Sequence, residues 1–238
     1  MKNLCLLLLF VSVTAISKTI PLEHFAQKSK FITMKIAPDG KHLAFTYEDE
    51  DQVKLGIMNM KSKKGTFSFD MGPNREAAQF WWANNNRVIV QSQRITGWLD
   101  GKKTYPEMFA ADIDGKKREL MWDYQNSYVR FVSLLEDDPD NILITKHHFA
   151  DKGSGKLQKL NIHTGKMSYQ EDSPELHGGF NSSIRFIGAD TKDVPRVAYE
   201  IDPKDLDDFD DNVGYLHVKN LSDEWEVIEF PKNRKDHP

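Results

Sequence analysis

Residues 31–47 read FITMKIAPDGKHLAFTY, and this stretch decides the fold. Apolar residues alternate with other residues on both sides of Pro38-Asp39-Gly40, which is typical of two short strands that each place one set on one sheet face. Proline fixes φ early in a turn, aspartate bonds its own backbone and glycine accepts a positive φ. The sequence therefore predicts a β-hairpin. The alternating positions are Ile32, Met34 and Ile36 before the turn and Leu43, Phe45 and Tyr47 after it.

The rest of the chain repeats this hairpin and two strands that follow it. Comparable places on the second strands fall at Phe45, Val90, Ile144 and Tyr199, with separations of 45, 54 and 55 residues. Short-strand units at intervals of about 40–50 residues are typical of β-propeller blades. We expect four four-stranded blades, at residues 31–75, 76–126, 127–175 and 180–230, after a lead-in segment at 18–30 and before a polar tail at 231–238.

A β-sandwich is the alternative all-β architecture. It also has short alternating strands, but with turn signals every 8–12 residues or so and no four-strand period. The period favours the propeller. Four blades either close a small ring or form part of a larger one. Nothing in the sequence supplies a strand shared by the first and last blades, so we expect an incomplete, open ring.

The first seventeen residues resemble a secretory signal peptide. Lys2 precedes the apolar run LCLLLLFVSV, and small and polar residues follow it. Ten apolar residues are too few to span a bilayer, which takes about 20. Cleavage after Ala15 or Ser17 would send the mature chain to the periplasm or out of the cell, leaving no membrane-bound segment.

The composition excludes several partners. The chain carries a net charge of −4, and its one cysteine lies in the predicted signal peptide, so the mature domain has none for disulfides. A mildly acidic protein without basic clusters is a poor ligand for nucleic acid or anionic membranes. The basic run at residues 61–64 is expected in a solvated turn. No cofactor is predicted.

Two segments resemble a known family. Pro21-Leu22-Glu23-His24-Phe25 followed by Ala37-Pro38-Asp39-Gly40-Lys41, and the second-blade run FWWANNNRVIV at 80–90, are similar to the propeller of bacterial prolyl oligopeptidase-family serine peptidases, dipeptidyl and acylaminoacyl peptidase-like. The resemblance covers roughly residues 20–230. It implies a propeller that gates substrate access and docks a catalytic α/β-hydrolase domain.

No catalytic residue can be carried over from that family. Its triad belongs to the hydrolase domain, and this chain has no Gly-x-Ser-x-Gly elbow, since Gly153-Ser154-Gly155 lacks the spacing and lies in an expected hairpin loop. We therefore expect the chain to be inactive by itself. Its partners would be a peptide substrate or a hydrolase domain. The alternative, on the same residues, is a free-standing TolB-like propeller that binds a protein or a peptide.

Other candidate sites have simpler interpretations. The acidic run at 202–211 does not fit calcium-loop spacing and is expected to be a solvated loop. His147 and His148 are adjacent, so on a strand they point to opposite faces and are poorly placed to bind one metal ion. Aromatic and cationic residues near the long second-blade loop are better candidates for a partner or substrate face. These are Arg94, Trp98 and Trp81.

Overall fold

The computed structural model describes residues 30–49, 52–95, 102–103, 107–123, 127–148, 150, 154–179, 181–203 and 213–229. The predicted signal peptide, all but the last residue of the lead-in segment, Trp98, most of the acidic run and the polar tail lie outside these residues. In the described residues, no helix is long and apolar enough to cross a membrane.

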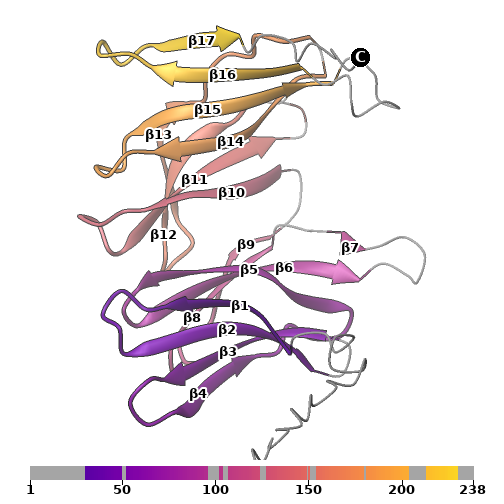
Figure 1. Ribbon diagram of the computed structural model, residues 1–238, viewed down its shortest axis with the longest axis vertical. Helices are drawn as coiled ribbons and strands as arrows, with labels where there is room; N and C mark the ends of the chain where they lie inside the picture. Colours follow the sequence, from indigo (N-terminus) through magenta and orange to yellow (C-terminus); the bar gives the residue numbers. More distant parts are fainter. Residues whose placement is uncertain are drawn as a thin grey trace, which may run out of the picture. The chain divides into compact units, whose positions relative to one another are not determined.

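The chain from Phe31 onward forms one unit that contains four antiparallel sheets in sequence order (Figure 1). The predicted all-β architecture is confirmed, and the four sheets are the blades of an open β-propeller. We number the sheets 1 to 4. Sheet 1 consists of β1 (Phe31–Ile36), β2 (His42–Asp49), β3 (Gln52–Asn59) and β4 (Lys64–Phe69).

The second sheet has one strand more than the sequence predicts. A two-residue strand, β7, pairs with the end of β6 inside the stretch that was expected to be a plain loop. The strands of sheet 2 are β5 (Arg75–Asn84), β6 (Arg87–Ile95), β7 (Lys102–Lys103), β8 (Met108–Asp112) and β9 (Glu119–Trp122).

The last two sheets each have four strands in sequence order. Sheet 3 consists of β10 (Ser127–Leu134), β11 (Asn141–His148), β12 (Lys156–Asn161) and β13 (Met167–Asp172). Sheet 4 consists of β14 (Ser183–Ala189), β15 (Pro195–Asp202), β16 (Val213–Lys219) and β17 (Trp225–Glu229).

Asparagine and aspartate side chains shape the turns. In the first hairpin, Gly40 has φ of 72°, its N–H donates to the Ala37 carbonyl at 2.9 Å, and Asp39 Oδ1 accepts the Lys41 N–H at 3.0 Å. The same carboxylate- or amide-to-backbone bond two residues ahead recurs in every sheet. It joins Asn59 to Lys61, Asn84 to Asn86, Asp114 to Lys116, Asn161 to His163, Asp190 to Lys192 and Asn220 to Ser222.

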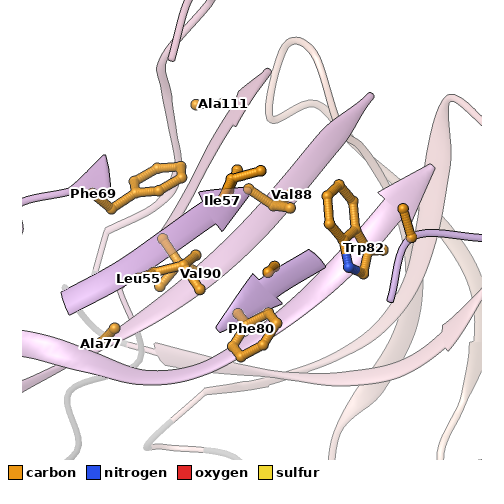
Figure 2. Packing of buried hydrophobic residues seen from close by; sticks show 11 residues of the cluster. Leu55, Ile57, Phe69, Ala77, Phe80, Trp82, Val88, Val90 and Ala111 are labelled. Carbon is orange, nitrogen blue, oxygen red and sulfur yellow. The ribbon is translucent and has the colours of Figure 1, made fainter. Parts of the chain in front are cut away.

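Apolar clusters join each sheet to the next. Between sheets 1 and 2, fully buried Leu55 and Ile57 pack with Val88 and Val90 (Figure 2). A second cluster joins sheets 2 and 3, and a third joins sheets 3 and 4. Since burying one such side chain contributes about 1.5–3 kcal/mol, these joints are the main source of cohesion. The repeat predicts that Tyr199 lies at the joint with the preceding sheet. Instead, its neighbour Ala198 belongs to the third cluster, and Tyr199 does not.

Hydrogen bonds from buried side chains to backbone atoms also cross the joints. Trp82 Nε1 donates to the Lys35 carbonyl at 2.9 Å between sheets 1 and 2. Arg87 of sheet 2 donates through Nε to the carbonyl of Ile162, just after β12 of sheet 3, at 2.6 Å. Arg130 of sheet 3 donates through Nη1 to the Ile184 carbonyl of sheet 4 at 2.8 Å. These bonds help to set the position of each sheet on its neighbour, in addition to the apolar contacts that hold the two together.

Candidate functional site: an arginine–glutamate cluster on the second sheet

Two arginines and one glutamate meet at one end of sheet 2. Arg75 opens β5 and Arg94 lies near the end of β6, and the register pairs these two residues directly across the strands. Glu107 comes immediately before β8. Cross-strand partners have Cβ atoms about 5 Å apart, so the sheet itself brings both guanidinium groups to one carboxylate. We call these three residues the arginine–glutamate cluster.

Both oxygens of the Glu107 carboxylate accept hydrogen bonds. Its side chain is 4% exposed, and Oε1 accepts hydrogen bonds from Arg75 Nη2 at 3.1 Å and Arg94 Nη2 at 3.0 Å. Its Oε2 accepts from the Ser92 hydroxyl at 3.1 Å, and its backbone carbonyl accepts the Ser92 N–H at 3.0 Å. Charge-assisted bonds of this kind are the strong ones, so the carboxylate is a fixed anchor.

The arginines, in contrast, reach the surface. The Arg75 side chain is 33% exposed and that of Arg94 is 44% exposed, whereas their shared anchor is buried. A guanidinium group is planar and presents N–H donors in a fork that fits a carboxylate. The cluster thus holds two partly exposed guanidinium groups on one buried carboxylate.

A second buried carboxylate, that of Glu76, lies next to the cluster along β5. Glu76 is fully buried, its Oε1 accepts from Gln93 Nε2 at 2.5 Å, and its Oε2 accepts the Val53 N–H of sheet 1 at 3.2 Å. Because Glu76 and Gln93 are the next cross-strand pair after Arg75 and Arg94, the site rests on the joint between two sheets. It is therefore preorganised.

Sheet 4 holds a second buried polar group, Glu200. Its carboxylate accepts the N–H groups of His177 and Gly178 at 2.9 and 2.8 Å and contacts His217 Nε2 at 2.7 Å. Burial works to raise the pKa of Glu200, but these hydrogen bonds outweigh it and hold the pKa below its ordinary value. The geometry ties the chain before β14 to the sheet, which is a structural role.

A polar cavity of about 490 Å³ lies between sheets 3 and 4. Lys219, whose side chain is 2% exposed, contacts Glu171 at 2.6 Å and Asp223 at 3.3 Å there. Lys159 contacts Asp138 at 2.8 Å. The charges that line the cavity are mixed, with a small acidic excess: five carboxylates, of Asp137, Asp138, Glu171, Asp193 and Asp223, and three lysines, Lys159, Lys192 and Lys219.

Of the three predicted face residues, the structure describes Arg94 and Trp81, and these two do not come together. Arg94 belongs to the cluster, and Trp98 lies outside the described residues. Trp81 stacks on Phe131 of sheet 3, with ring centroids 4.7 Å apart, and so packs between sheets. Trp81 pairs with Ile89, five residues before Arg94, which places the two roughly 16 Å apart along the strand.

The histidine pair and the glycine–serine loop have structural surroundings. His147 is 2% exposed and lies 2.9 Å from the Thr145 hydroxyl, while His148 is exposed. Among the described residues, no group of three or more histidine, cysteine, aspartate or glutamate side chains could hold a metal ion. Ser154 precedes Gly155, whose backbone exchanges hydrogen bonds with Ser173 at 2.8 and 2.9 Å in a loop between two strands.

No family model matches the sequence, and no curated protein matches it either. Solved structures do. A puromycin-hydrolysing peptidase of Mycobacterium tuberculosis has a TM-score of 0.48 and 12% identity over 87% of this chain and 30% of its own. The β-propeller domain of the Trilobed protease of Pyrococcus furiosus has 0.47 and 11% over 86% and 56%. TolB of Acinetobacter baumannii has 0.44 and 9% over 84% and 43%.

These structural neighbours include propeller domains of the prolyl oligopeptidase family as well as TolB. At such identities the likeness concerns the fold. The chain spans about three tenths of the length of the peptidases it matches. What those proteins do therefore enters below as a proposal.

Proposed function

We propose that this chain is the non-catalytic propeller part of an exported serine peptidase, which gates substrate access and docks the hydrolase domain. The observation that carries the proposal is the arginine–glutamate cluster. It holds two partly exposed guanidinium groups on a buried carboxylate, braced by the joint between two sheets. The sequence resemblance supplies the class of protein, and the cluster supplies the surface.

The cluster recognises a carboxylate. A peptide's free carboxyl end, or an acidic side chain on the docked domain, would lie across the exposed edges of Arg75 and Arg94 in a forked, charge-assisted contact. Glu107 keeps the two cations from separating by mutual repulsion. A surface of this kind selects and positions an acidic group.

Fluorescence anisotropy with a labelled short peptide tests this recognition. We expect the free-acid peptide to bind more tightly than its C-terminal amide, and Arg94→Ala to weaken the free acid about tenfold, as loss of one charged hydrogen bond predicts. Arg196→Ala is the matched control, because Arg196 is 43% exposed and bonds to Asp190 at 2.9 Å in a turn of sheet 4. Equal binding of acid and amide would refute the proposal.

The peptidase assignment and the export have their own tests. An antibody against the chain should detect it in the periplasmic or secreted fraction, in a polypeptide large enough to include a hydrolase domain. Detection of a polypeptide no larger than the chain itself would favour the TolB-like alternative. A serine-reactive probe should leave the purified chain unlabelled, and labelling would contradict both functions.

A further inference from the structure

A small apolar pocket adjoins the arginine–glutamate cluster. It has a volume of about 260 Å³ and lies between sheets 1 and 2, where β4 and the residues after it face β8 and β9. Register pairs Phe109 directly with Leu120, so these two side chains form the wall on sheet 2. The apolar residues that line the pocket are Phe67, Phe69, Met71, Phe109, Ala110 and Leu120. We call this cavity the apolar pocket.

The wall on sheet 1 is held in place by its neighbours. The Phe67 and Phe69 rings meet edge to face, with centroids 4.8 Å apart, and Phe69 is buried in the apolar cluster of Figure 2. Phe67 also packs on the turn between β8 and β9, where Gly115 has φ of 76° and a Cβ atom would collide with the ring. The Arg118 guanidinium lies 4.9 Å from the centroid of the same ring. The pocket is therefore preorganised.

Arg75 belongs to both the apolar pocket and the arginine–glutamate cluster. It lines the pocket, and its Nη2 donates to Glu107 Oε1 at 3.1 Å. In the last residue of a peptide, the free carboxylate and the side chain are attached to the same Cα atom. A ligand of this kind needs a cation directly beside an apolar pocket, and the shared arginine provides that arrangement.

We propose, in an inference that rests on the proposed function, that the apolar pocket binds the side chain of the last residue of a peptide whose free carboxylate lies on the arginine–glutamate cluster. The selected peptides end in a large apolar residue such as leucine or phenylalanine. Cavities that hold a whole drug-sized ligand have volumes of about 300–1,000 Å³, and this slightly smaller one suits a single large side chain.

The charged groups at the pocket favour an uncharged side chain in the ligand. Two carboxylates and two guanidinium groups line it, those of Asp70, Glu119, Arg75 and Arg118. A second carboxylate on the ligand would be repelled by the two acids, and an ammonium group would be repelled by the two arginines. An apolar side chain avoids both costs and is buried against the aromatic rings.

Fluorescence anisotropy with the full chain tests the pocket, using labelled peptides that differ only in the last residue. We expect free-acid peptides that end in leucine or phenylalanine to bind about tenfold more tightly than one that ends in alanine, because more apolar surface is buried. Peptides that end in aspartate or lysine should bind no more tightly than the alanine peptide. Each peptide is also measured as its C-terminal amide.

Two variants test where the side chain binds. Phe67→Ala removes one wall, and Leu120→Gln makes the other wall polar at a position that is 47% exposed, so it should not affect folding. Each should reduce the preference for leucine over alanine to at most about threefold and retain the preference for acid over amide. Ile228→Gln is the matched control, because Ile228 is 51% exposed on β17 of sheet 4 and lies outside the pocket; it should keep the full preference. Circular dichroism confirms that each variant is folded.

The pocket and the carboxylate recognition fail in different ways. Free-acid peptides that bind alike whatever their last residue, but more tightly than their amides, would overturn the pocket and leave carboxylate recognition standing. Tightest binding of the lysine peptide, or a leucine preference that survives in both pocket variants, would also overturn the pocket. Equal binding of acids and amides would refute carboxylate recognition and the role of the pocket with it.

Discussion

The two faces of sheet 1 differ far more in surroundings than in sequence. The inner face buries Leu55 and Ile57 completely, while the outer face leaves Met34 and Ile36 about three-fifths exposed. Both sets are apolar and both alternate along their strands. The inner set meets sheet 2, whereas no sheet of the described residues packs on the outer set. Alternation thus predicts which residues share a face, but not whether that face has a neighbour.

The largest expected difference is between a side chain of the joint and one of the outer face. Leu55→Ala should lower the free energy of unfolding by about 3 kcal/mol, through lost burial and a residual cavity. Met34→Ala should change it by less than about 0.5 kcal/mol, because Met34 is 61% exposed. Urea unfolding measures both. Equal losses would mean that the two faces do not differ as described.

A polar link of the joint between sheets 2 and 3 should matter almost as much. The Arg87 side chain is 1% exposed, bonds to Asp112 at 2.8 Å and donates to the Ile162 carbonyl. Arg87→Met should cost about 2–3 kcal/mol by leaving those acceptors unpaired, less than for a wholly buried pair because Asp112 is 21% exposed.

Arg118→Met provides the comparison for Arg87. Arg118 is exposed, its Nε donates to the Gly115 carbonyl within the same sheet, and its guanidinium lies 4.9 Å from the centroid of the Phe67 ring of sheet 1, so among the hydrogen bonds and ring contacts of the described residues it adds a cation–π contact but no hydrogen bond across a joint. Its loss should cost at most about 1 kcal/mol, because a cation–π contact at an exposed site contributes little. The same urea titration measures it, and a cost as large as that of Arg87→Met would argue against a special role for bonds that cross the joint.

Much of the fold was predictable because local signals agree with it. The Pro38-Asp39-Gly40 turn, alternating strands and the four-strand period each specify short-range structure. Contacts between sheets were harder to predict from the sequence. Tyr199 falls out of step with Val90 and Ile144 because adjacent strand residues point to opposite faces, so a spacing that is wrong by one residue selects the wrong face, and Ala198 lies in the joint instead.

The candidate site was predictable only in part, at Arg94. Its partners come from strand register and from a residue thirteen positions away, so Arg75 and Glu107 gave no local signal. Trp81 was chosen for its aromatic ring, yet that ring stacks on Phe131 of the neighbouring sheet and is only partly exposed. A side chain's role here depends on which sheet packs next to it, a tertiary property.

The smallest expected effect concerns adjacent residues of β15 that point to opposite sides. Tyr199 faces outward, whereas Glu200 is fully buried with its pKa held below the ordinary value. The folded state binds the ionised form more favourably, so Glu200 stabilises the fold above the unfolded pKa of about 4.3. That contribution falls as the pH drops through the lower, folded pKa.

Unfolding free energies measured between about pH 3 and pH 7 should therefore decline toward acid more steeply for the natural chain than for Glu200→Gln. Glu226→Gln is the matched control: Glu226 lies on β17, exposed, where it accepts from Asn220 Nδ2 at 2.7 Å. In that variant the unfolding free energy should still decline steeply toward acid pH. If Glu200→Gln showed the same steep decline, protonation of the Glu200 carboxylate would not be its cause, and another titratable residue would account for the loss of stability in acid.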